Sequence, residues 1–159
     1  MPLYMKYNEI DGGVKTEGYV KWIELHSLEW TATRKVNMTM GQPADRSVTW
    51  PDVSEITVTK SMDVSSNPLL EEALGGTLTG TVEIALCSVR NKNMVELAQY
   101  TMSNTGITVY ASSTSGDTPM ETLRLNFTQI AVKYTSLNRT LNGNPRVSTY
   151  DLATMKLSS

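Results

Sequence analysis

Few side chains of this sequence could carry nucleophilic or metal chemistry. His26 is the only histidine and Cys87 the only cysteine among the 159 residues. A metal site or a catalytic nucleophile needs several such groups held together, and these two stand alone in separate alternating stretches. We therefore expect a structural histidine, an inert thiol, and neither a metal nor a cofactor.

Three carboxylates and two glycine runs offer the remaining chemistry. Asp63, Glu71 and Glu72 could form the acidic pair of a glycoside hydrolase, but both glutamates fall near the start of a predicted helix, where they complement its dipole. The runs DGG (11–13) and LGGTLTG (74–80) lack the order of strand, glycine loop and helix that a phosphate site requires. We expect a protein that is not an enzyme.

Composition limits the class of protein. Net charge is −2 and the 14 Lys and Arg residues are scattered, which argues against a nucleic-acid partner. Apolar residues make up 40% of the chain, yet no run is long enough for membrane insertion. No secretory signal is visible and a single cysteine suits a reducing compartment, so we expect synthesis in the cytoplasm. At this length we expect one domain, residues 1–159.

Most of the chain alternates every two residues and is rich in Thr, Val, Ile and Tyr, which predicts short antiparallel strands with one dry face. No linker or internal repeat divides them. About eight strands are predicted, at Leu3–Ile10, Trp22–Thr33, Val53–Met62, Leu78–Ser88, Met94–Met102, Thr105–Ser112, Thr122–Tyr134 and Arg146–Leu157.

The turn residues Asn104–Gly106 predict a short-loop hairpin between the strands on either side of them. The segment VELAQY (95–100), just before this turn, also has helix propensity, so a helix there remains an alternative.

Within the stretch 120–134 the apolar residues change from one face of the strand to the other, with Phe127 before the change and Val132 after it. A β-bulge at Thr128 or Gln129 would reverse every later side chain. We expect the strand to turn a corner there, between two sheets or around a barrel.

The segment SSNPLLEEALGG (65–76) predicts the one clear helix, about two turns long. Ser66 or Asn67 would cap it, Pro68 would lie in its first turn, and Gly75 would end it. Its apolar residues have helical spacing and should seal one side of the sheets; they are Leu69, Leu70, Ala73 and Leu74.

The stretch Arg34–Asp52 is the longest without a predicted element, and long loops in compact proteins are usually functional. We treat it as the leading contact segment, with a plain surface loop as the alternative. The strand before it places Trp22, Glu24, His26 and Trp30 on one face, a mixture that suits contact with another protein surface.

Three segments, in their order and spacing, carry a resemblance to a known family. They are WIELHSLEW (22–30), ITVTKSMDVSSNPLLEEALGG (56–76) and LRLNFTQIAVKY (123–134). Together they resemble the Hcp family, the haemolysin-coregulated proteins of bacterial type VI secretion systems, over nearly the whole chain. The residues that carry the resemblance are Trp22, Glu24, Trp30, Lys60, Asp63, Leu70, Ala73, Leu125, Asn126, Phe127 and Tyr134.

The resemblance implies a mainly β fold, an antiparallel, barrel-like pair of sheets with one short flanking α-helix, in agreement with the strand pattern. It also implies a non-catalytic subunit whose homohexameric rings stack into the inner tube of the secretion system. Such a tube meets spike and sheath proteins, is expelled from the cytoplasm without a signal peptide, and can shelter effector proteins in its lumen.

The resemblance also points to the contact residues. In the family, the extended loop after the Trp30 strand reaches a neighbouring protomer or ring; many relatives carry a glycine-rich run there, where this chain has Gly41 alone. Because the chain stops soon after its last predicted strand, we expect a tube subunit without an appended toxin domain. The implied contact residues are Met38, Met40, Gln42, Pro43, Asp45 and Arg46.

A protein of another class remains the alternative. A monomeric β-sandwich or barrel could bind a small molecule or glycan, with Trp22, Trp30 and Trp50 as stacking residues.

Overall fold

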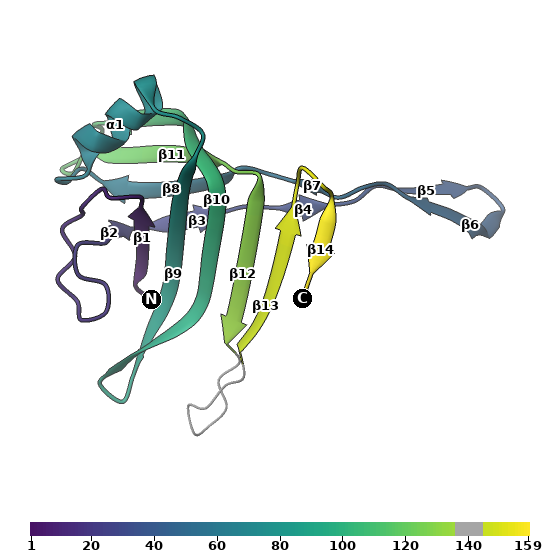
Figure 1. Cartoon of the computed structure of the whole chain (residues 1–159), viewed down its shortest axis with the longest axis horizontal. Helices are drawn as coiled ribbons and strands as arrows, with labels where there is room; N and C mark the ends of the chain where they lie inside the picture. The colour runs from purple at the N-terminus through teal and green to yellow at the C-terminus, as the bar shows by residue number, and fades with distance from the viewer. Residues whose placement is uncertain (136–144) are drawn as a thin grey trace.

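The computed structural model describes residues 1–135 and 145–159, with the side chains of all of these except residues 43–45. The described residues form antiparallel strands and one helix (Figure 1). The prediction of a mainly β, barrel-like fold with one short flanking helix is confirmed.

Two sheets share one long strand and together make the barrel. The first has the order β14-β13-β12-β10-β9-β1-β2 and the second the order β10-β11-β8-β3. Strands β12 to β14 extend the first sheet beyond the barrel (Figure 1). The bounds are β1 Leu3–Tyr7, β2 Ile23–Leu25, β3 Ser27–Glu29, β8 Ile56–Ser61, β9 Gly80–Arg90, β10 Asn93–Ser113, β11 Met120–Asn126, β12 Gln129–Thr135, β13 Pro145–Asp151 and β14 Lys156–Ser158.

Strand β10 corrects the predicted hairpin at Asn104–Gly106. It runs without a break for 21 residues and pairs with β9 and β12 in its first part and with β11 in its second. Asn104 has a φ of 49°, and the register with β9 shifts between Met102 and Thr105. The turn residues therefore form a bulge that bends one strand from the first sheet into the second, because a bulge increases local bend and twist.

The predicted corner after Phe127 is confirmed, although it is a break between two strands and not a bulge within one. Strand β11 ends at Asn126 in the second sheet, and β12 begins at Gln129 in the first. Phe127 is buried at the corner, and the Thr128 amide donates to the Ser103 carbonyl. The face change thus marks the passage of the chain between sheets.

Three other predicted strands are interrupted. Trp22–Thr33 divides into β2, β3 and β4 (Ala32–Thr33), and Val53–Met62 into β7 (Asp52–Val53) and β8. Arg146–Leu157 is a hairpin of β13 and β14. Short strands suit a barrel whose sheets bend sharply.

Both faces of the first sheet are partly covered. The main core fills the barrel, and a second cluster forms on the outer face, where Tyr4 and Cys87 lie under Tyr19 and Trp22. The prediction of a single dry face is therefore wrong at this end of the sheet, because residues 11–22 fold back over it.

The helix α1 (Ser66–Gly75) flanks the barrel against β10 (Figure 1). Its N-cap is Ser65, one residue earlier than predicted, and the Asp63 carboxylate accepts a hydrogen bond from the Ser65 amide. Leu69 is fully buried as expected, but Leu74 is 79% exposed. The prediction that Leu74 seals the sheets is wrong, because it lies on the outer side of the helix.

The stretch Arg34–Asp52, predicted to lack a firm element, is largely a β-hairpin. Strands β5 (Val36–Thr39) and β6 (Gln42–Val48) pair with each other, and at their base β4 pairs with β7. Figure 1 shows this hairpin projecting far from the barrel. Its described side chains are all exposed, so the alternation of a half-buried strand is missing from its sequence.

Candidate assembly surface

The hairpin and its connections, residues 34–51, are called the arm here. Thr39 pairs with Gln42, which leaves Met40 and Gly41 as a two-residue turn. Gly41 has a φ of 83°, a conformation that glycine adopts without strain. A tight turn of this kind needs no glycine-rich run to close the hairpin.

One face of the arm is apolar and exposed. Val36 lies opposite Val48, and Met38 lies two residues further along the same strand face. Val36 is 54% exposed and Met38 58%. A two-stranded ribbon alone is marginally stable in water, so exposed apolar side chains on such a ribbon indicate a surface that another chain covers.

The residues implied as contacts all lie on the arm. Met40 is at its tip and is 98% exposed, while Met38, Gln42 and Arg46 are also exposed. Met38 pairs with Arg46 across the hairpin. Pro43 and Asp45 belong to β6, but their side chains lie outside the described residues.

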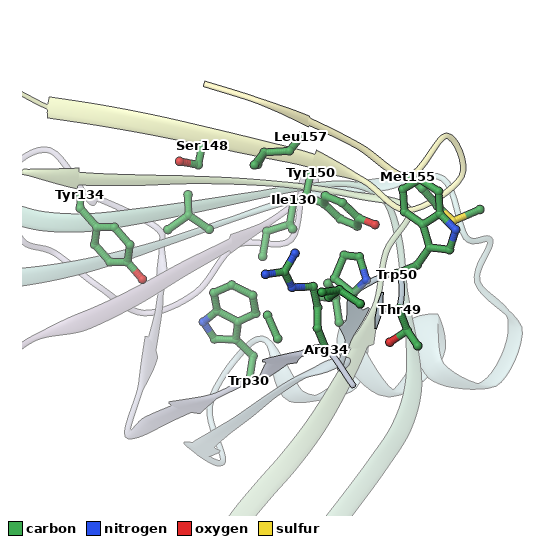
Figure 2. A pocket seen from close by; sticks show the side chains of 15 residues that line it. Trp30, Arg34, Thr49, Trp50, Ile130, Tyr134, Ser148, Tyr150, Met155 and Leu157 are labelled. Carbon is green, nitrogen blue, oxygen red and sulfur yellow. The ribbon is translucent and has the colours of Figure 1, made fainter. Parts of the chain in front are cut away.

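An apolar groove of about 750 Å³ lies where the arm leaves the barrel. The arm and its approach supply one wall, and the extension of the first sheet supplies the other (Figure 2). The residues of the first wall include Trp30, Arg34, Val48 and Trp50, and those of the second Val132, Tyr134, Tyr150, Met155 and Leu157.

Packed aromatic rings support the inner end of this groove. Trp30 and Tyr134, which line the groove, each pack edge-to-face with Tyr100, at centroid distances of 6.2 Å and 6.3 Å. Edge-to-face packing of this kind holds the rings in fixed positions. Burial raises the pKa of Tyr100 to about 12, with the adjacent Tyr134 hydroxyl as a further cause, so the hydroxyl stays neutral near pH 7.

Arg34 is the only basic side chain that lines the groove in the part of the chain that the structure describes. Figure 2 shows it projecting into the groove, between Trp30 and Trp50 in this view. It forms no ion pair with any described residue. A guanidinium beside aromatic and aliphatic walls is suited to a carboxylate brought by another surface.

The residues that carry the family resemblance are mostly structural. Lys60 is fully buried and contacts Asp63 at the start of the helix. Glu24 is exposed, and Asn126 is half-buried. Trp30 and Tyr134 line the groove, whereas Trp22 covers the outer cluster. Leu125 and Phe127 lie in the main core, Ala73 packs against it, and Leu70 is half-buried.

His26 and Cys87 have different surroundings in the structure. His26 is exposed, with Nε2 2.7 Å from the Ser61 hydroxyl. Cys87 is buried, and burial raises the pKa of its thiol. Across residues 1–135 and 145–159, no three metal-binding side chains come together and no helix is long and apolar enough to cross a membrane.

The sequence places Arg34 in the predicted contact segment, and Trp30 and Trp50 among the stacking residues of the alternative, but it does not reveal the opposite wall of the groove. The opposite wall comes from Tyr150, Met155 and Leu157, more than 100 residues further along the chain. No local pattern connects these two stretches, because their proximity depends on how the first sheet extends past the barrel.

Comparison with solved structures identifies the fold. A structure described as a type six secretion system protein is 24% identical, with a TM-score of 0.87 and 99% of each chain covered. Hcp1 from Salmonella typhimurium is 20% identical, with a TM-score of 0.78 over 99% of this chain and 98% of that one. A mutant Hcp1 from E. coli EAEC 042 is 16% identical, with a TM-score of 0.77 over 96% and 99%. The fold is that of type VI secretion proteins.

The family model described as "Type VI secretion system effector, Hcp" matches residues 4–134. The chain therefore belongs to the Hcp family, which confirms the resemblance seen in its sequence segments. It is a tube or effector protein of the type VI secretion system. A comparison with curated protein sequences gave no match.

Proposed function

We propose that this chain is a structural subunit of the inner tube, that residues 1–159 act as one domain, and that its copies close into hexameric rings that stack. Family membership supports the tube role. The hexamer is the assembly that the resemblance implies. Head-to-tail contacts between unlike surfaces close into a ring when the rotation between neighbours divides a full turn.

The observation that carries the proposal is the arm. Trp50 is 69% exposed and Met40 98% exposed, on a ribbon that projects from the barrel without cover from the rest of the described chain. A protruding apolar ribbon on a protein with net charge −2 is readily explained by contact with another copy. The arm therefore fits a subunit that assembles and not one that works alone.

The proposed tube role also implies where the protein acts and which partners it meets. The rings assemble in the cytoplasm, meet spike and sheath proteins, and leave the cell with effector proteins in their lumen. The role is structural and not catalytic, and it needs neither nucleic acid nor insertion into a membrane.

The first test is the mass of the purified protein, measured by size-exclusion chromatography with light scattering at several concentrations. Six times 17.6 kDa is about 106 kDa, the mass expected of a hexameric ring. Electron microscopy of the same sample would then show rings and stacks. A monomer of 17.6 kDa at every concentration would overturn the tube-subunit proposal.

One observation favours the alternative of a ligand-binding protein. Trp30 and Trp50, two of the three proposed stacking residues, line the same groove, and its volume lies within the usual range for ligand sites. Trp22 lies elsewhere. If the protein were monomeric, a screen of glycans and aromatic small molecules by calorimetry would test this second function.

A further inference from the structure

We propose that the groove of one copy receives the outer face of helix α1 of an adjoining copy, with Arg34 meeting Glu71. This inference rests on the proposed assembly and names the two surfaces that meet. This surface is called the helix patch here and consists of Glu71 and Leu74 on α1 and of Met62, Val64 and Leu78 in the segments that flank α1 along the chain.

The helix patch is apolar and exposed without any other described segment over it. Val64 is 70% exposed, Leu74 79%, and Met62 and Leu78 59% and 57%. Leu74 and Glu71 lie three residues apart on the helix, so they are neighbours on its surface. The patch thus combines an exposed leucine with an adjacent carboxylate.

The charges of the two surfaces are opposite. The arm sequence contains Arg34, Lys35 and Arg46 against a single acidic residue, Asp45. Between Lys60 and Arg90 the chain has no basic residue, and α1 carries two adjacent acidic residues, Glu71 and Glu72. Such complementarity steers encounter and fixes the register of an interface.

The shapes of the two surfaces also correspond. The groove is an apolar hollow of about 750 Å³ lined by Arg34, which has no ion-pair partner among the described residues, and the helix patch carries exposed apolar side chains. Docking an apolar helix face into such a groove is a common mode of recognition.

The placement of the two surfaces suits a repeating assembly. Figure 1 shows α1 at one end of the long axis of the molecule and the base of the arm, where the groove lies, nearer its middle. A contact between them is therefore head-to-tail, and each copy offers one surface of each kind. A two-fold dimer could join the two surfaces reciprocally, but it would occupy both at once and leave none for a further copy, so the mass of the assembly separates a dimer from a ring.

Charge reversal with mutual rescue tests the pairing. Arg34→Glu places a carboxylate opposite Glu71. The concentration below which the assembly dissociates should therefore rise by about tenfold or more. A tenfold change corresponds to about 1.4 kcal/mol per contact. Glu71→Arg should act in the same way. The chain carrying both changes should recover most of the assembly, because every interface then has the reversed pair.

Lys35→Glu is the matched control. It makes the same charge change on the adjacent arm residue, which does not line the groove, and it should change dissociation less than Arg34→Glu. Two results would show that the pairing is wrong when the wild type assembles: Arg34→Glu dissociates no more readily than the wild type, or the double change restores no assembly. Either result leaves the tube role standing. If the wild type is a monomer, both proposals are overturned.

Photo-crosslinking gives a second measurement that does not depend on charge. Replacing Trp50 by p-benzoylphenylalanine places the reactive group at the groove, and mass spectrometry of the irradiated assembly locates the adduct. Adducts between copies at residues 62–78 would support the docking. Adducts between copies that fall only elsewhere would overturn it.

Discussion

The Lys60 ammonium and the Glu121 carboxylate form a buried ion pair, with Nζ 2.7 Å from Oε2. Their side chains are 0% and 3% exposed. The same ammonium lies 2.9 Å from the Asp63 carboxylate and donates to the Ser61 carbonyl. Because Asp63 also accepts from the Ser65 amide at the N-cap, this pair connects two barrel strands to the start of the helix.

Lys60→Met should strongly destabilise the fold. It leaves the Glu121 carboxylate buried without its cation, and breaking a buried pair typically costs about 3–5 kcal/mol in the free energy of unfolding. Urea denaturation followed by circular dichroism measures the change. Lys21→Met, which breaks the exposed pair with Asp11, is the control and should cost less than about 1 kcal/mol. Equal losses for the two variants would contradict this role of Lys60.

Tyr7→Phe should reduce the alkaline sensitivity of the fold. Burial, with Glu72 as a second cause, raises the pKa of Tyr7 from 10.0 to about 12. As pH rises, the Tyr7 hydroxyl ionises in the unfolded chain before it ionises in the folded chain. The stability that the neutral hydroxyl contributes to the folded state is therefore complete below pH 10 and is lost between pH 10 and 12. Phenylalanine does not ionise, and the slope of stability against pH in this window should be smaller.

The same variant has a second expected result near pH 7. The Tyr7 hydroxyl is buried and has no hydrogen-bond partner among the described residues, so its removal should change stability by no more than about 1 kcal/mol. Urea titrations at pH 7, 10 and 11.5 of wild type and variant give both quantities. An alkaline slope identical to that of the wild type would disprove the assignment to Tyr7.

Removal of the arm should abolish assembly without unfolding the barrel. Thr33 pairs with Asp52 at its base, so residues 34–51 can be replaced by an Asn-Gly turn that closes a short hairpin. We expect a monomer whose urea midpoint stays close to that of the wild type monomer, because the described arm side chains except Pro51 are exposed. An assembly of unchanged mass would show that the arm is not a contact.

A milder version of this experiment changes Asp45 and Arg46 to alanine. It should weaken assembly without unfolding the protein, but an exposed ion pair contributes only about 0–1 kcal/mol, so the effect should be smaller than that of the deletion. Light scattering across a dilution series measures both variants. A larger loss from the double alanine change than from the deletion would contradict this order.

Gly12→Ala should destabilise the cover of the outer cluster. A Cβ at this position would overlap the Trp22 carbonyl oxygen, so the backbone must shift, which typically costs about 1–3 kcal/mol. Gly13→Ala is the matched control, since nothing lies within 4 Å of its Cβ. Thermal unfolding should separate the two variants, and equal midpoints would refute the close contact.

Local patterns determined much of the fold. The alternation of β9 and the apolar spacing around Leu69 predicted a strand and a helix that are present. The face change after Phe127 predicted a corner, and the chain passes between sheets there. These predictions hold because the spacing of apolar residues in a strand or a helix can be read from residues that are close together in the sequence.

Other features were decided by tertiary structure alone. Asn104 lies in a bulge and not in a hairpin turn, because β10 has partners on both sides of that point from distant parts of the chain. The arm lacks the alternation of a buried strand, since no other described part of the chain covers it.

The sequence by itself therefore determined the β class, the helix and the family of this protein, because these depend on residue types and their spacing. Only the tertiary structure brought Arg34 and Tyr150 into one groove, and Lys60 and Glu121 into one ion pair. Both arrangements depend on the order in which distant strands pair, and the period of any single strand carries no information about its partner.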